Sequence, residues 1–468
     1  MRERYSLLFL LPILHVSILL LSGDCVNSLR IIENLPGFYG PLPFKLETGY
    51  MAIGEEEEIE LFYYFVESER KPQHDPLLVW IAGGPGCSTL RAFFFEIGPL
   101  NFDYIRSRGS KPVLVLNPFS WTKVSNVIYL DTPVGAGFSY AKNSDAYKTS
   151  DTLSSKHVYD FLRKWVRDHP RLISNPLYIA GVSYSGIVVP IIAQEIYNGN
   201  EAGNKPHLNI NGYIIGNPLT DRDIDFNSRI PYANRFALLS DPLFQSAKEN
   251  CLGDYLNPAN SLCARDLSEV DECLMFINAY NILEPSCGSF EGTRGASSPL
   301  RLLQLQQTGC RTDNYEYNVI WANDENVQRA LGIRKGTIQE FEECNMDHYS
   351  IGKDDTDTYS YNIASSIAYH RNLTNKSCRA LIFSGDHDLV VPHLGTERWV
   401  HSLNLTLERS RWAPWFVHQE VAGYGIKFSH ENYSLTFATV KGAGHAAPEY
   451  KPEECLAMVE RWLAHTPL

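Results

Sequence analysis

The fold of this chain is decided by the stretch Leu177-Tyr178-Ile179-Ala180-Gly181-Val182-Ser183-Tyr184-Ser185-Gly186. Residues 177–180 have the composition of a buried strand, and residues 187–197 have the pattern of a helix. A serine between small residues at such a junction matches the nucleophile elbow, a tight turn that lifts the serine out of the sheet. The flanking residues must be small because the two backbones crowd the turn. We therefore predict that Ser183 is a nucleophile; the alternative is an ordinary serine in a packing turn.

Two later segments carry side chains that could complete a catalytic triad. Ser384–Asp388 and Gly442–His445 each follow a predicted strand directly. The order serine, acid, histidine is that of α/β-hydrolases. The histidine would take and return the serine proton, while a carboxylate orients its imidazole. Spacing alone leaves Asp386 and Asp388 as alternative acids.

A glycine-rich turn, residues 83–86, follows the apolar strand 77–81. An oxyanion hole needs backbone N–H donors near the attacking serine, and this turn is well placed to supply one. The N–H of Tyr184 would be the other. The competing interpretation, a phosphate cradle, lacks the Lys-Ser/Thr that follows the glycines of a P-loop.

Strands and helices alternate along the rest of the chain, which predicts a mainly parallel sheet covered on both faces. A strand pair between residues 49 and 68 precedes this pattern. The further predicted strands are 127–130, 380–383 and 435–440, and the further helices are 151–168 and 453–464.

The domain organisation follows from where this alternation breaks. Between residues 222 and 345 strand runs become rare, and five of the ten cysteines fall between residues 251 and 310. We predict an α/β-hydrolase core in two parts, 26–221 and 346–468, with an inserted cap at 222–345.

The composition excludes other classes of protein. With 44% apolar and 20% charged residues the chain of 468 residues can form a packed interior, so global disorder is excluded. A formal net charge of −13 argues against a nucleic-acid partner. The chain contains no CxxC pair and no HExxH motif, so we expect neither a metal site nor a cofactor.

The N-terminus has the pattern of a secretory signal peptide, predicted over residues 1–25. Arg2 and Arg4 precede an apolar stretch that is short for a membrane span, and small residues follow it. Four glycosylation sequons agree with secretion. They lie at Asn372, Asn375, Asn404 and Asn432. We therefore expect a secreted or vacuolar protein with no membrane association after signal cleavage.

Several motifs between about Leu35 and the C-terminus together carry a family resemblance. They are Gly83-Gly84-Pro85-Gly86-Cys87-Ser88, Asp131-Thr132-Pro133-Val134-Gly135-Ala136-Gly137-Phe138-Ser139-Tyr140, Gly181–Gly186, Gly216-Asn217-Pro218, Trp321-Ala322-Asn323-Asp324 and Gly444-His445. On these motifs the chain resembles the serine carboxypeptidase-like proteins of plants.

The resemblance implies Ser183, Asp388 and His445 as the triad and Gly84 and Tyr184 as the oxyanion donors. It also implies three disulfides. These are Cys87–Cys344, Cys251–Cys263 and Cys287–Cys310, which leaves Cys273, Cys378 and Cys455 without assigned partners.

The family that the chain resembles has a carboxypeptidase branch and an acyltransferase branch, and three positions bear on the choice. The carboxypeptidases hold the substrate carboxylate with an asparagine before Gly-Gly-Pro-Gly, a glutamate in the next helix and a glutamate in the elbow. Here these substrate-binding positions hold Ala82, Glu96 and Val182. We expect Glu96, without its acidic neighbour, to be ionised and to repel a carboxylate. The elbow with Ser185 and the stretches Ser384–Asp388 and 447–455 resemble the acyltransferases, which usually have Asp at the position of Val182.

Three functions remain open at this point. The favoured hypothesis is acyl transfer, through a serine acyl-enzyme, from a 1-O-glucose ester to an alcohol or amine. The second is a carboxypeptidase that releases C-terminal residues of peptides. The third is a catalytically silent binding protein on the same fold, which a complete triad disfavours.

Overall fold

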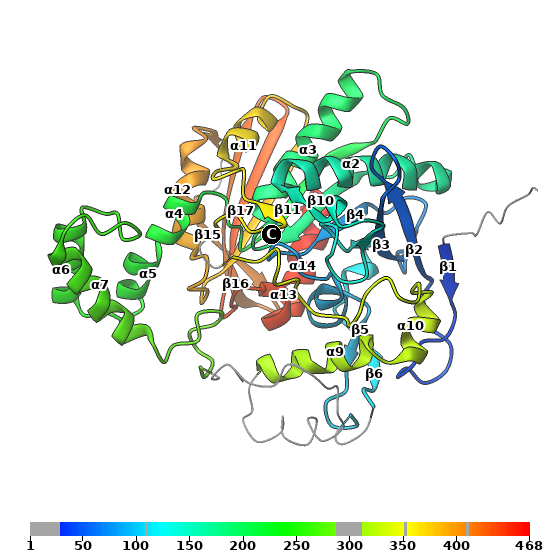
Figure 1. Cartoon of the computed structure of the whole chain (residues 1–468). Helices are drawn as coiled ribbons and strands as arrows, with labels where there is room; N and C mark the ends of the chain where they lie inside the picture. The colour runs from blue at the N-terminus through cyan, green and yellow to red at the C-terminus, as the bar shows by residue number, and fades with distance from the viewer. Residues whose placement is uncertain (1–28, 108–110, 287–310, 351–352, 409–410) are drawn as a thin grey trace, which may run out of the picture.

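The computed structural model describes residues 29–107, 111–286, 311–350, 353–408 and 411–468. One large mixed sheet forms the centre, with helices on both of its faces (Figure 1). Its strands follow the order β1-β2-β3-β7-β4-β10-β11-β13-β17-β16-β14. Their bounds are β1 Leu29–Ile32, β2 Leu46–Ile53, β3 Ile59–Val66, β7 Asn126–Leu130, β4 Leu77–Ile81, β10 Leu177–Val182, β11 Ile210–Gly216, β13 Arg379–Gly385, β17 Tyr433–Val440, β16 Glu420–His430 and β14 Thr406–Leu407.

The middle of the sheet is parallel and its two margins are antiparallel. Each neighbouring pair from β7 through β4, β10, β11 and β13 to β17 is parallel. Parallel strands end at the same edge, so the loops after β4, β10, β13 and β17 meet there. This is the predicted α/β-hydrolase fold, and it brings the segments singled out above to one edge of the sheet.

Both faces of the central strands are buried, which explains their continuous apolar sequence. Along β4, Leu78 and Trp80 belong to one apolar cluster, while Val79 and Ile81 belong to the other. The second cluster lies under helices α2 Asp151–Asp168, α3 Ser185–Glu201, α11 Ile367–Leu373 and α12 His393–Ser402. The first contains residues of α14 Pro452–Leu463 and α9 Glu316–Ala322.

Some elements were not predicted from the sequence. The strand β16 has a largely exposed face and shows no continuous apolar run, although it pairs with β17 over Gly425–His430. The strand β11 is buried but begins with Ile-Asn-Gly, which weakens the strand pattern. The predicted helix 151–168 matches α2, and the predicted helix 187–197 is the middle of α3.

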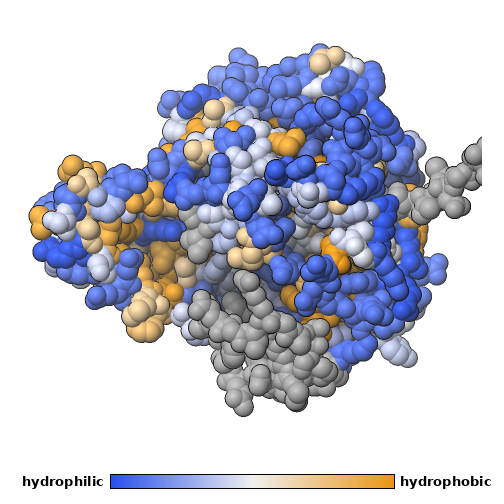
Figure 2. Space-filling view, in the orientation of Figure 1, coloured by the Kyte–Doolittle hydropathy of each residue, from blue (hydrophilic) through white to orange (hydrophobic). Residues whose placement is uncertain are grey.

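The segment 222–345 has two differently packed parts among the described residues. Helices α4 Arg222–Asn227, α5 Arg229–Arg235, α6 Asp241–Cys251 and α7 Ser261–Leu274 lie at one side of the molecule (Figure 1). The last three contribute to a small apolar cluster that also contains Leu389 and Leu394 of the core, and Figure 2 shows further apolar side chains at the surface of this lobe. In contrast, Trp321 of α9 and Val327 of α10 Glu325–Leu331 are buried in the large cluster of the core.

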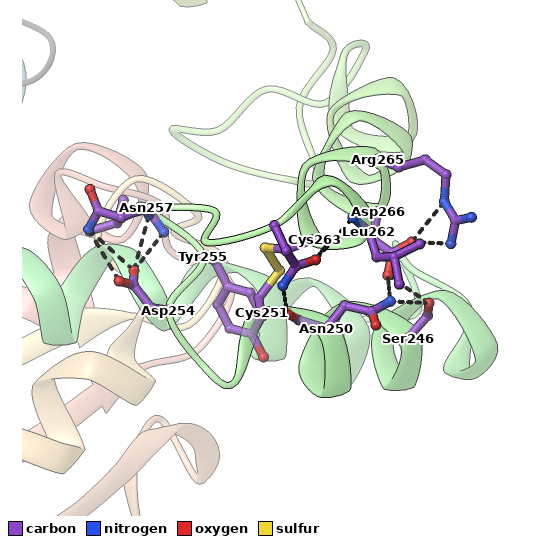
Figure 3. Close-up of a disulfide and its surroundings, with 12 residues drawn as sticks. Ser246, Asn250, Cys251, Asp254, Tyr255, Asn257, Leu262, Cys263, Arg265 and Asp266 are labelled. Atoms are coloured by element: carbon purple, nitrogen blue, oxygen red, sulfur yellow. Dashed lines mark hydrogen bonds and ion pairs between the residues drawn. A yellow bond between two sulfur atoms is a disulfide. The ribbon is translucent and has the colours of Figure 1, made fainter.

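A disulfide joins the end of α6 to the beginning of α7. It links Cys251 and Cys263, one of the pairings that the resemblance implies (Figure 3). Beside it, Asp266 accepts hydrogen bonds from Ser246 and Asn250 at 2.6 Å each. These contacts fix the two helices against each other.

Some predictions about secretion concern residues that the structure describes, and others concern residues that it does not. The predicted signal peptide and the predicted disulfide Cys287–Cys310 lie outside the described residues. All four sequon asparagines are exposed, which leaves them accessible to a glycan. In the described part of the chain, no helix has both the length and the apolar character that a membrane crossing requires.

Candidate active site

The turn between β10 and α3 holds Ser183 in a left-handed backbone conformation with φ of +61°. Such a conformation is uncommon for a residue with a side chain and is a feature of functional turns. The small neighbours are required by close approach. A Cβ added to Gly181 would lie 2.5 Å from the Ile81 carbonyl oxygen, and one added to Gly186 would lie 2.3 Å from that of Leu219.

Ser183, His445 and Asp388 form a continuous hydrogen-bonded chain. The Nε2 atom of His445 lies 2.8 Å from Ser183 Oγ, and its Nδ1 atom lies 2.8 Å from Asp388 Oδ2. Asp388 is fully buried and also accepts hydrogen bonds from Asn217 Nδ2 and the backbone N–H of Val390. In this geometry the histidine can remove the serine proton while the carboxylate holds its ring in place.

The geometry distinguishes the two aspartates that spacing left open. Asp386 contacts His387 Nδ1 at 2.6 Å and accepts from the backbone N–H of Gly442 at 2.7 Å, and no hydrogen bond joins it to His445. Asp388 is therefore the carboxylate that orients the histidine.

The glycine-rich turn after β4 lies against the serine. A Cβ added to Gly83 would come within 2.8 Å of the Ser183 Cβ atom. Ser185 ties the elbow to this turn by donating hydrogen bonds to the carbonyls of Ile81 and Ala82 at 2.8 and 2.9 Å. Within the described residues, no hydrogen bond uses the backbone N–H of Gly84 or Tyr184. Both belong to the wall of the pocket, where they could receive an oxyanion.

A pocket of about 380 Å³ opens beside Ser183 and His445. The three predicted substrate-binding positions, Ala82, Glu96 and Val182, all line it. Its wall is mostly apolar and aromatic, with a few charged side chains, as is typical of small-molecule sites.

The expectation that Glu96 is ionised is wrong. Glu96 is only 3% exposed, and burial raises its pKa to about 8, with the nearby carboxylates of Glu449 and Glu343 acting in the same direction. Arg91, whose Nε lies 3.9 Å from Glu96 Oε1, opposes this shift only in part. Loss of an acid at position 182 therefore does not ionise Glu96 in acid solution, because burial, together with the two nearby carboxylates, raises its pKa.

Sequence reasoning missed the ionic network behind Glu96. Arg91 Nη1 lies 2.9 Å from Glu343 Oε1, and its Nη2 lies 3.6 Å from Glu449 Oε2. Glu449 also accepts a hydrogen bond from Tyr315 at 2.8 Å. Glu449 lies in the stretch 447–455 singled out above, and Arg91 lies outside every motif named there. No local pattern signals that the two meet, since they are distant in sequence.

The described cysteines fall into two groups. The disulfide Cys87–Cys344, implied by the resemblance, is present, and both of its residues line the pocket. It ties the residue directly after the glycine-rich turn to the segment after α10. Cys273 is exposed, whereas Cys378 and Cys455 are buried, and all three are free thiols.

Comparisons with known proteins agree with this geometry. A family profile described as serine carboxypeptidase matches residues 36–465. The chain is 44% identical to Serine carboxypeptidase-like 7 of Arabidopsis thaliana over 458 residues, which cover 97% of this chain and 98% of that protein. It is 45% identical to Serine carboxypeptidase-like 3 of the same plant over 95% of this chain and 94% of the relative.

A solved structure shows the same fold at lower identity. The prohormone-processing carboxypeptidase Kex1(Δ)p from Saccharomyces cerevisiae has a TM-score of 0.71 to this chain at 20% identity. The match covers 90% of this chain and 91% of the yeast protein. With the profile match and the near full-length plant relatives, these findings show that the chain belongs to the serine carboxypeptidase family.

Proposed function

We propose that this protein is a serine acyl-enzyme catalyst that transfers an acyl group from a 1-O-glucose ester to an alcohol or amine acceptor. Ser183 attacks the ester carbonyl, and His445 takes its proton and returns it to the departing sugar oxygen. The acceptor then attacks the acyl-enzyme, with His445 as its base. The N–H groups of Gly84 and Tyr184 stabilise the two tetrahedral intermediates.

The single observation that carries the choice of acyl transfer is the apolar lining at Ala82 and Val182. Both side chains face the pocket, at positions where related carboxypeptidases carry groups that bind a terminal carboxylate. An alanine and a valine donate no hydrogen bond to that group. Acyl transfer from a glucose ester does not require a terminal carboxylate and is unaffected by this loss.

One observation favours the carboxypeptidase alternative. Glu96 is protonated below a pH of about 8 because it is buried, so it can donate a hydrogen bond to a peptide carboxylate. A carboxypeptidase that relies on Glu96 alone would work in acid and lose activity as Glu96 ionises.

Incubation of the pure protein with a panel of glucose esters plus acceptors, and separately with blocked dipeptides, tests the choice between pH 4 and 8. We expect acylated acceptors from the first panel and slow hydrolysis of the second. Ser183→Ala is the control that removes the acyl-enzyme. Efficient release of C-terminal residues without acyl transfer would establish the carboxypeptidase alternative.

We also infer that the protein acts in the secretory pathway, in the vacuole or outside the cell. The leader-like residues 1–25 and the four exposed sequons support this. Separation of the plant cell into vacuolar and extracellular fractions, with detection by antibody, tests it. Retention in the cytosol with an intact leader would contradict the inference.

A further inference from the structure

The catalytic pocket contains three basic side chains, and they differ in whether carboxylates balance them. Arg91, Arg229 and Lys353 all line the pocket. Arg91 has Glu96, Glu343 and Glu449 within 4.0 Å, so its charge is balanced. Across the described residues, no carboxylate lies within ion-pair distance of Arg229 or of Lys353.

Arg229, at the beginning of α5, donates hydrogen bonds to a backbone carbonyl. Its Nε and Nη2 atoms donate to the Val390 carbonyl at 2.9 and 2.7 Å. Its guanidinium carbon lies over the Phe226 ring, 4.1 Å from the ring centroid. The nearest acids are engaged elsewhere: Asp388 in the triad and Asp225 with the backbone N–H of Thr220.

Lys353 approaches from another part of the chain. Its Nζ atom donates to the Gly84 carbonyl at 2.8 Å and lies 4.2 Å from the centroid of the Tyr349 ring. Burial, and next the charge of Arg229, lower the pKa of Lys353 to about 8. An ammonium has three donors, and the Gly84 carbonyl uses one of them.

Two partly buried cations with no carboxylate at ion-pair distance are costly to keep in one pocket. An anion bound between them would offset that cost, because each charge would gain a partner and Lys353 would gain an acceptor. We propose that Arg229 and Lys353 form an anion subsite of the catalytic pocket that binds a carboxylate group carried by the substrate.

This inference rests on the proposed function, which supplies the class of substrate. To that class it adds a carboxylate, carried by the acyl donor or by the acceptor. The subsite lies in the same pocket as Ser183, so a bound carboxylate would position the substrate for the reaction. A carboxylate on the acyl group and one on the acceptor present the same chemistry to these cations.

Direct binding tests the subsite without any reaction. Isothermal titration calorimetry would compare succinate with its uncharged analogue succinamide. We expect the intact protein to bind succinate at least about tenfold more tightly than succinamide, because a charge-assisted contact replaces a neutral one. Lys353→Met should remove that preference and Lys353→Arg should keep most of it.

Lys156→Met, on the exposed side of α2, is the matched control and should bind both compounds as the intact protein does. Thermal unfolding confirms that each variant is folded. Arg229→Gln is a poorer test, because its lost bonds to Val390 would also disturb the loop that carries Asp388. Equal binding of succinate and succinamide, or a preference that survives in Lys353→Met, would overturn the proposal.

Two kinetic arms distinguish the source of the carboxylate. The first compares acylation of Ser183 by mono-p-nitrophenyl succinate and by p-nitrophenyl butyrate. The second compares glycolate with ethylene glycol as acceptors for a neutral acyl group. A preference for the anion in the first arm assigns the subsite to the acyl group, and in the second to the acceptor.

The two proposals fail in different ways. If succinate binds as expected but no glucose ester acylates the protein, the subsite stands and the proposed function fails. If glucose esters transfer their acyl groups but neither calorimetry nor the two arms show a preference for the anion, the subsite fails alone.

Discussion

Replacement of Glu96 by glutamine should change how the stability of the protein depends on pH. Glu96 is buried beside the pocket, and its Oε2 atom has no hydrogen-bond partner among the described residues. Burial raises its pKa from an ordinary 4.5 to about 8. The folded state therefore keeps the proton through a pH range in which the unfolded chain has already released it.

The sign of the effect follows from linkage. Below pH 4.5 both states are protonated, and Glu96 makes no pH-dependent contribution. Between pH 4.5 and about 8 the unfolded state gains free energy by ionising, so the protein loses stability as pH rises. The loss reaches at most about 5 kcal/mol near pH 8, since one pKa unit corresponds to about 1.36 kcal/mol. Glutamine cannot ionise, so Glu96→Gln escapes this loss.

Urea unfolding followed by tryptophan fluorescence at pH 4.5, 6.5 and 8 measures the effect. We expect the free energy of unfolding of Glu96→Gln to rise relative to that of the unchanged protein as pH increases. Glu342→Gln is the matched control, because Glu342 is exposed. Glu449, whose pKa burial also raises, is present in all three proteins. A difference between Glu96→Gln and the unchanged protein that stays constant with pH would refute the reasoning.

Three further predictions concern the chemistry. Ser183→Ala should abolish labelling by a sulfonyl fluoride and lower turnover by several orders of magnitude, and labelling that persists would contradict the assignment. Asp388→Asn should lower kcat by about 10⁴, whereas Asp386→Asn should cost less than about tenfold, as steady-state kinetics would show. The double change Ala82→Asn with Val182→Glu restores two hydrogen bonds to a carboxylate, each of about 1.5–3 kcal/mol. It should raise kcat/KM for blocked dipeptides by about 10²–10⁴, and an unchanged rate in a folded variant would argue against this role.

The sequence by itself determined the strand-elbow-helix unit, because it depends on contacts between near neighbours. The apolar strand at 177–180, the small residues around Ser183 and the helix after them all lie between residues 177 and 197. The order of the later segments with Asp388 and His445 then predicted the fold, since parallel strands deliver their ends to one edge. Strand β16, which has one largely exposed face, gave no comparable pattern.

The tertiary structure alone decided the charges in the pocket. The sequence suggested that Glu96 is ionised, because it showed that the family's acidic neighbour is missing. It could not show that Glu96 is buried close to Glu449 and Glu343, and that burial sets its pKa. It also could not show that Arg229 and Lys353 face one pocket without a carboxylate between them. The pKa of a side chain, and whether its charge is balanced, depend on its solvent exposure and on charged groups from distant parts of the chain. Folding alone fixes that exposure and those neighbours.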